Sequence, residues 1–122
     1  MIVDDSQIML TAIKETFTGM GPPCDFIEAE SDETAMVFLE TRKIDLVLLD
    51  LNMSKISGIN LLREVRAVDK ELPIIVVSSE AAKYSVIEAL KYGATDFIIK
   101  PVDAETLKNK LGKLDLFRET SP

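Results

Sequence analysis

The stretch that decides the fold is Asp45-Leu46-Val47-Leu48-Leu49-Asp50, a nearly continuous apolar run that ends on a carboxylate. A strand of this composition is buried on both faces, which is typical of the interior of a parallel sheet. Two further apolar runs also stop at charges: residues 1–3 precede Asp4-Asp5, and residues 97–99 precede Lys100. Ligands bind at the carboxyl ends of parallel strands, so these charges predict a functional site.

Strand-like and helix-like segments alternate outward from this run in both directions. We expect strands at residues 1–3, 25–29, 45–50, 73–77 and 95–99. We expect helices at residues 6–17, 31–41, 58–68, 82–92 and 104–116. Such an alternation predicts an α/β fold, a doubly wound five-stranded parallel sheet with helices on both faces. Because no linker interrupts it, a single domain over residues 1–122 is expected.

Helical periodicity also predicts which side chains face the core. The apolar positions of the expected first and third helices are Ile8, Leu10, Ile13, Phe17, Leu61, Leu62, Val65 and Val68. In the expected second helix, Ala35, Met36 and Leu39 are placed inward.

Composition excludes several classes of function. The net charge of −7 argues against binding to nucleic acid or to an anionic membrane surface, because both need a basic footprint. No apolar run approaches the roughly 18 residues of a membrane span, and no leader pattern is visible. The single Cys24 cannot form an internal disulfide, which favours the cytoplasm. The absence of histidine removes Ser-His-Asp and Cys-His catalysis from consideration.

The charges at the strand ends suit phosphoryl transfer to a carboxylate. Asp50 is the best acceptor, because a rigid buried strand would deliver it to the sheet edge and a carboxylate can hold a phosphoryl group. Asp5, Asp50 and, through water, Asp4 would bind Mg²⁺, which prefers oxygen ligands. Lys100 and the metal would neutralise the phosphoryl oxygens in the transition state. Without a cation the carboxylates would repel one another and the phosphate, so magnesium dependence is expected.

Several motifs occur in an order and spacing that resemble a known family. They are Asp4-Asp5-Ser6, Asp50-Leu51-Asn52-Met53, Gly58, the run Pro73 to Ser79, Gly93-Ala94 and Lys100-Pro101. Together they resemble the response-regulator receiver domain, the phospho-accepting half of two-component signalling. The resemblance implies the flavodoxin-like strand order 2-1-3-4-5. It also implies a histidine kinase or phosphotransfer protein as donor, the backbone carbonyl of Asn52 as a magnesium ligand, and a cis bond before Pro101.

The resemblance also implies a switch and an output surface. The hydroxyl of Ser78 would bond the phosphoryl group while the ring of Phe97 turns inward, which changes the surface that a downstream protein or domain reads. A phosphorylation-dependent dimer is compatible with this scheme. The expected output face joins the fourth helix, fifth strand and last helix, with Ala81, Lys83, Val86, Leu90, Phe97 and Lys110. For Val86 and Leu90, an exposed apolar strip and ordinary core packing are both open. For Met9, Leu10 and Ile13 on the first helix, docking of the kinase and ordinary core packing are likewise both open.

Three features depart from the family pattern. The first strand is short although it should be central, which suggests that native N-terminal residues precede it. Ser54 stands where a proline often follows the methionine. Phe97 lacks a tyrosine hydroxyl, so a switch through it must be steric.

Rival functions make different demands on the same residues. A pseudo-receiver, a binding module regulated without phosphorylation, would have lost an acid or the lysine. A magnesium-dependent phosphatase would need a second acid where Asn52 stands, and a flavodoxin would need a phosphate-cradling loop where Asp4-Asp5 stand. We therefore expect a phospho-acceptor switch rather than an enzyme. It would assist its own phosphorylation and dephosphorylation, with Asn52 and Glu80 flanking the path of the hydrolytic water.

Overall fold

The computed structural model describes residues 1–4, 6–20, 25–51, 58–79, 83–100 and 102–112. Its strands are β1 (Ile2–Val3), β2 (Glu28–Ala29), β3 (Val47–Asp50), β4 (Ile74–Ser78) and β5 (Asp96–Ile99). Its helices are α1 (Gln7–Met20), α2 (Asp32–Thr41), α3 (Gly58–Val68), α4 (Lys83–Lys91) and α5 (Ala104–Leu111). The predictions for Asp5, Cys24, Asn52, Ser54, Glu80 and Pro101 fall outside the described residues.

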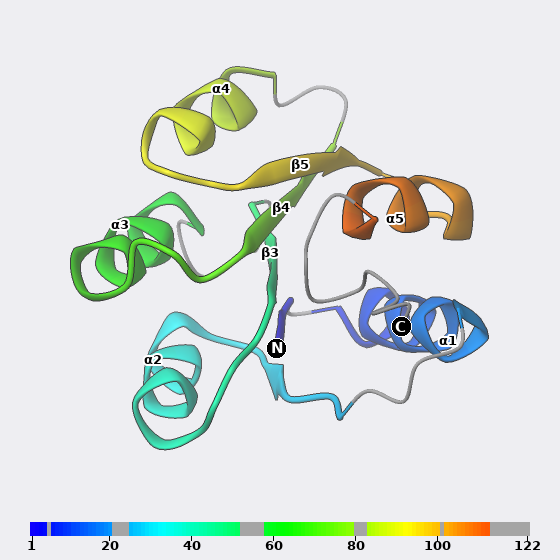
Figure 1. Cartoon of the computed structure of the whole chain (residues 1–122), viewed down its shortest axis with the longest axis horizontal. Helices are drawn as coiled ribbons and strands as arrows, with labels where there is room; N and C mark the ends of the chain where they lie inside the picture. The colour runs from blue at the N-terminus through cyan, green and yellow to red at the C-terminus, as the bar shows by residue number, and fades with distance from the viewer. Residues whose placement is uncertain (5, 21–24, 52–57, 80–82, 101, 113–122) are drawn as a thin grey trace, which may run out of the picture.

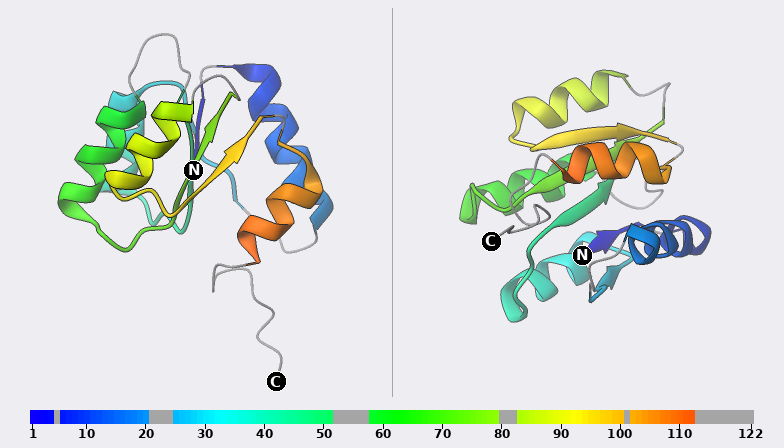
Figure 2. Two further views of the ribbon diagram at one scale, coloured as in Figure 1. Left: turned by 90° about the horizontal axis from the view of Figure 1, so that it is seen from above. Right: turned by 45° about the vertical axis from the view of Figure 1, so that its right-hand side comes forward.

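The strands form one parallel sheet in the order β2-β1-β3-β4-β5, which confirms the predicted topology. Helices α1 and α5 cover one face, and α2, α3 and α4 cover the other (Figure 1). Two further directions show the same three layers (Figure 2). Both faces of the sheet are covered, which explains why β3 and β4 are buried along their whole length.

The core divides into two clusters, one on each face of the sheet. Alternate residues of a strand point to opposite faces, so Leu49 and Val76 pack under α2, α3 and α4, whereas Leu48 and Ile75 pack under α1 and α5. Short β1 is held firmly between its neighbours: Ile2 N donates to Ile27 O at 2.8 Å, and Leu48 N donates to Met1 O at 2.9 Å.

Local hydrogen bonds explain where several helices begin. The hydroxyl of Ser6 accepts from Met9 N at 3.3 Å before α1, and that of Ser31 accepts from Thr34 N at 3.1 Å before α2. The carboxylate of Asp103 caps α5 by accepting from Thr106 N at 2.7 Å, which lowers the pKa of Asp103.

Some predicted boundaries and orientations were wrong. The second strand contains only Glu28–Ala29, and the first helix continues to Met20. Ile8 is 86% exposed because, at 100° per residue, it lies on the side of α1 opposite to the core residues. Val68 is 80% exposed because it is the last residue of α3. The last helix ends at Leu111, and residues 113–116 are outside the described part.

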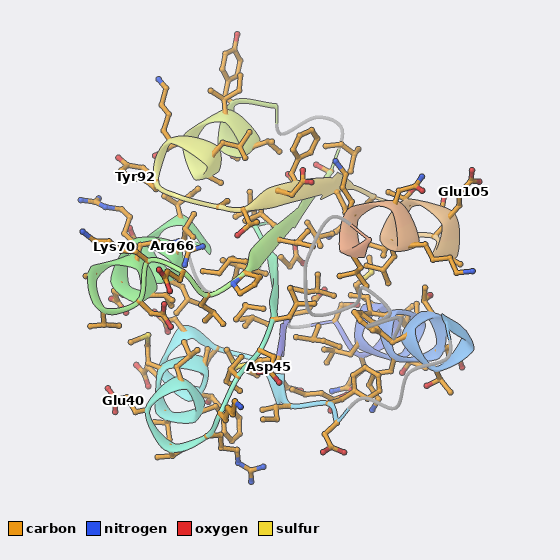
Figure 3. The ribbon with its side chains drawn as sticks, in the orientation of Figure 1. Glu40, Asp45, Arg66, Lys70, Tyr92 and Glu105 are labelled. Atoms are coloured by element: carbon orange, nitrogen blue, oxygen red, sulfur yellow. The ribbon has the colours of Figure 1, made fainter. Side chains whose placement is uncertain are left out.

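Arg66 joins the end of α3 to the turn that leads from α4 into β5. Its guanidinium donates to Gly93 O at 2.8 Å, to Asp69 O at 3.0 Å and to Thr95 Oγ1 at 3.4 Å. Partial burial lowers the pKa of Arg66. Gly93 has a φ of +105°, which favours glycine, and a Cβ there would lie 3.2 Å from Arg66 carbons. Figure 3 shows Arg66 extending from α3 beside this turn.

Candidate functional site at the carboxyl edge of the sheet

Three predicted charged residues meet where β1, β3 and β5 end. Val3 pairs with Leu49, so the next residue of each strand brings Asp4 beside Asp50. The backbone N–H of Asp4 donates to Ala29 O at 3.0 Å and so keeps Asp4 in the ladder with β2. Parallel strands end at the same edge of the sheet, so residues that are far apart in the sequence meet there.

The alternation of side chains separates the candidate residues into two groups. Asp50 follows Leu48 by two residues, so it has the orientation of the face that α1 and α5 cover. The same alternation places Asp4 and Lys100 with that face, because they follow Ile2 and Ile98 by two residues. Ser78 and Phe97 have the opposite orientation, toward α2, α3 and α4. The charged groups and the proposed switch residues therefore project from opposite faces.

Asp50 and Lys100 form an ion pair across the intervening strand β4. The Nζ of Lys100 lies 3.2 Å from Asp50 Oδ2. The Asp50 side chain is 5% exposed and the Lys100 side chain is 26% exposed, so the carboxylate is desolvated while the ammonium reaches solvent. The backbone N–H of Lys100 donates to Ser78 O at 2.8 Å, which fixes the start of this side chain relative to β4. A cation is thus held beside the carboxylate that is the predicted acceptor.

Asp4 is a buried carboxyl group with a raised pKa. Burial, together with the charge of Asp50 and a hydrogen bond to it, raises the pKa of Asp4 from 3.8 to about 6. The backbone N–H of Ser6, which donates to Asp4 Oδ1 at 2.9 Å, and the charge of Lys100 oppose this rise. Among the causes that raise the pKa of Asp4, burial is larger than the charge of Asp50.

This arrangement fits a divalent cation. Asp4 and Asp50 offer adjacent carboxylate oxygens, the donors that Mg²⁺ prefers, and a bound cation would offset the burial and the Asp50 charge that raise the pKa of Asp4. Asp5 and Asn52, the other two predicted ligands, lie outside the described residues. Within the part that is described, no group of three acidic, histidine or cysteine side chains could hold a metal.

Ser78 and Phe97 lie on neighbouring strands close to the charged cluster. Ser78 is fully buried at the end of β4, and its hydroxyl donates to Ser79 O at a long distance of 3.4 Å. Phe97 is half-buried and packs against the core on the α2, α3 and α4 face. A hydroxyl held by so long a bond has little to lose by turning to a better acceptor.

Only some of the side chains of the predicted output face are exposed to solvent. Val86 is buried, whereas Leu90 is 42% exposed, so the two do not form one exposed strip. Val86 therefore belongs to the core. Tyr84 and Ile87, which sequence reasoning did not select, are 88% and 52% exposed on the outer side of α4. Ala81 and the side chain of Lys83 are outside the described part.

The apolar residues of α1 that were considered for docking a kinase are mostly not exposed. Leu10 and Ile13 are buried in the core, and Met9 is half-buried against it. The core reading of Leu10 and Ile13 is therefore correct. Among the described residues, no helix is both long and apolar enough to cross a membrane.

Comparisons with known proteins agree with this geometry. The family model described as "Response regulator receiver domain" matches residues 1–112. A chemotaxis protein CheY homolog of Campylobacter jejuni is 39% identical over 114 residues, covering 91% of this chain and 87% of the relative. Chemotaxis protein CheY1 of Helicobacter pylori is 40% identical over 114 residues, with 91% of both chains covered. The receiver domain of NtrX from Brucella abortus superposes with a TM-score of 0.82 at 26% identity, covering 89% of this chain and 91% of that one. The chain belongs to the response regulator receiver domain family of two-component signal transduction.

Proposed function

We propose that this receiver accepts a phosphoryl group on Asp50 from the phosphohistidine of a kinase or phosphotransfer protein. The observation that carries the proposal is the cluster itself. Asp50 is buried at the carboxyl edge of the sheet, with the carboxyl group of Asp4 against it and the ammonium of Lys100 at 3.2 Å. A nucleophilic carboxylate with a fixed positive charge beside it is what phosphoryl transfer to a side chain needs from the protein, in addition to the metal ion.

In the proposed reaction, an oxygen of Asp50 forms a bond to phosphorus while the bond from phosphorus to the donor imidazole nitrogen breaks. The electron pair of the broken bond stays on the imidazole, which takes up a proton from solvent. Lys100 stabilises negative charge on the phosphoryl oxygens, since its ammonium already lies beside Asp50. Mg²⁺, when bound, would neutralise further charge on those oxygens, and Asp4, Asp5, Asp50 and the carbonyl of Asn52 would hold it.

The proposed readout uses the two residues on the other face of the sheet. The hydroxyl of Ser78, at the end of β4, would turn from Ser79 O to the phosphoryl group. Phe97 would then move inward on β5, and a partner protein or domain would read the changed surface of α4, β5 and α5. The exposed side chains Tyr84, Ile87 and Leu90 are the apolar part of that surface. Hydrolysis assisted by Asn52 and Glu80, a phosphorylation-dependent dimer and a cytoplasmic location stay predictions from the sequence.

The acceptor is tested with acetyl phosphate, a small donor that removes the need for a partner kinase. Intact-mass measurement after incubation with Mg²⁺ should show one added phosphoryl group, and chelation by EDTA should prevent the addition. Asp50→Asn keeps the size of the side chain but removes the nucleophile, so it should stay unlabelled. Glu40→Gln removes one exposed carboxylate from α2 and should be labelled like the parent chain.

Labelling of Asp50→Asn to the extent of the parent would place the acceptor elsewhere. If the parent is not labelled at all, yet binds a signalling partner, the pseudo-receiver alternative is favoured. Turnover of an external phosphomonoester would instead favour the phosphatase alternative.

A further inference from the structure

Lys110, on α5, makes two contacts with consecutive residues of β5. Its Nζ lies 3.0 Å from Asp96 Oδ1 and 4.6 Å from the centroid of the Phe97 ring. The carboxylate of Asp96 also accepts a hydrogen bond from the backbone N–H of Phe97 at 2.8 Å. One ammonium group therefore contacts both the ring and the carboxylate that precedes it.

The place of this ammonium in the fold is unusual, because Asp96 and Phe97 point to opposite faces of the sheet. Phe97 packs with the α2, α3 and α4 cluster, whereas α5 covers the other face. Strand β5 is at the edge of the sheet, and the α5 side chain reaches around that edge to the ring. A ring that touches Lys110 is therefore directed toward the open edge of the sheet.

The contact is of a kind that fixes the position of the ring. An ammonium within about 6 Å of a ring centroid is attracted to the ring face, and the attraction grows when the pair is partly desolvated. The side chains of Lys110 and Asp96 are 21% and 23% exposed, so this pair is better shielded than an ordinary surface ion pair. An inward movement of Phe97 would break the cation–π contact without breaking the ion pair.

We propose that Lys110 is a positioning residue that holds Phe97 at the open edge in the unphosphorylated protein and so opposes the switch. The inference rests on the proposed function, in which the ring moves inward on phosphorylation. A cation–π contact at a partly exposed site contributes about 0.5–1 kcal/mol, which corresponds to a roughly two- to fivefold change in an equilibrium. By linkage, whatever shifts the ring equilibrium shifts the affinity for a phosphoryl group in the same proportion.

The experiment compares Lys110→Met with the parent chain, because methionine keeps an unbranched apolar side chain and removes only the cation. Lys110→Arg restores a cation that can stack on the ring. Lys108→Met removes an exposed charge from the same helix and controls for net charge. Two quantities are measured: the ring resonances of labelled Phe97 in the free protein, and the affinity for beryllofluoride with Mg²⁺, a stable mimic of the phosphoryl group.

In Lys110→Met, the inward ring population should rise and beryllofluoride should bind about two- to fivefold more tightly. Lys110→Arg and Lys108→Met should resemble the parent in both measurements. A merely structural lysine would give the opposite result for affinity, because a loosened α5 cannot improve binding. Unchanged or weaker binding in Lys110→Met, or an equal gain in Lys108→Met, would overturn the proposal.

The ring measurement separates this proposal from the proposed function. If the parent chain binds no beryllofluoride and Asp50 is not phosphorylated, the proposed function fails. The ring resonances of the free protein still decide whether Lys110 positions Phe97: ring resonances that do not respond to Lys110→Met overturn the positioning role as well.

Discussion

Replacing Asp4 by asparagine should stabilise the metal-free protein at neutral pH. Asparagine keeps an oxygen that accepts from Ser6 N and gains an amide that can donate to Asp50, so both contacts of Asp4 survive. What it removes is a buried charge. Burial and Asp50 raise the pKa of Asp4 from 3.8 to about 6. At about 1.4 kcal/mol for each pKa unit, ionised Asp4 destabilises the fold by up to about 3 kcal/mol.

The sign of the pH dependence follows from this raised pKa. Between pH 3.8 and about 6, the folded state holds the proton of Asp4 more tightly than the unfolded state does. The contribution of Asp4 to the stability of the parent chain therefore falls as the pH rises through this window, and it falls no further above it. The advantage of Asp4→Asn should be near zero below pH 4 and reach its full value above pH 7.

The assay is urea unfolding followed by circular dichroism, in EDTA, at several pH values between 4 and 8. The difference in unfolding free energy between Asp4→Asn and the parent is plotted against pH, which cancels the titration of groups that do not interact with Asp4. Added Mg²⁺ should stabilise the parent more than the variant, because Asp4 is a proposed ligand. A variant that is no more stable than the parent at pH 7.5, or a difference that does not change with pH, would refute the reasoning.

Two other substitutions test close contacts, one beside Asp50 and one between α3 and the turn before β5. Gly58→Ala should lower stability by about 1–3 kcal/mol and slow labelling by acetyl phosphate, since the new Cβ would lie 3.0 Å from the backbone oxygen of Asp50. Normal stability and normal labelling would show that the start of α3 can move without disturbing the acceptor. Arg66→Met should lower the unfolding free energy in urea by about 1–2 kcal/mol, because the Gly93 carbonyl loses its charged donor. An unchanged urea midpoint would mean that water replaces the guanidinium at no loss.

The alternation of strands and helices along the chain and the convergence of the charges could be anticipated, because both depend on short local patterns. The apolar run at residues 45–50 predicts that this strand is buried on both faces, and the end of a parallel strand predicts that its last side chain lies at the edge of the sheet. The pairing order could not be derived in that way and came from the resemblance. Asp4, Asp50 and Lys100 come together because each of them follows a strand that ends at the same edge of the sheet.

Contacts between distant side chains were beyond the reach of the sequence. Val86 and Leu90 lie on one side of α4 by spacing, yet one is buried and the other is exposed, because neighbouring elements cover the helix unevenly along its length. The contact of Lys110 with Phe97 depends on a side chain that rounds the edge of the sheet, and no spacing rule describes it. The raised pKa of Asp4 depends on burial in three dimensions, which composition cannot show.

The opposite orientations of the two groups of site residues have a consequence for how such a domain can diverge. The charged groups project with the face that α1 and α5 cover, whereas Ser78 and Phe97 project with the face of α2, α3 and α4. In the proposed switch, the two groups are linked by the hydroxyl of Ser78, which turns to the phosphoryl group, and by the backbone of β4 and β5, where Lys100 N donates to Ser78 O at 2.8 Å. The sheet thus lies between the phosphorylation site and the surface of α4. Substitutions on the outer side of α4 can therefore change which partner protein binds, while the rates of phosphorylation and dephosphorylation stay the same.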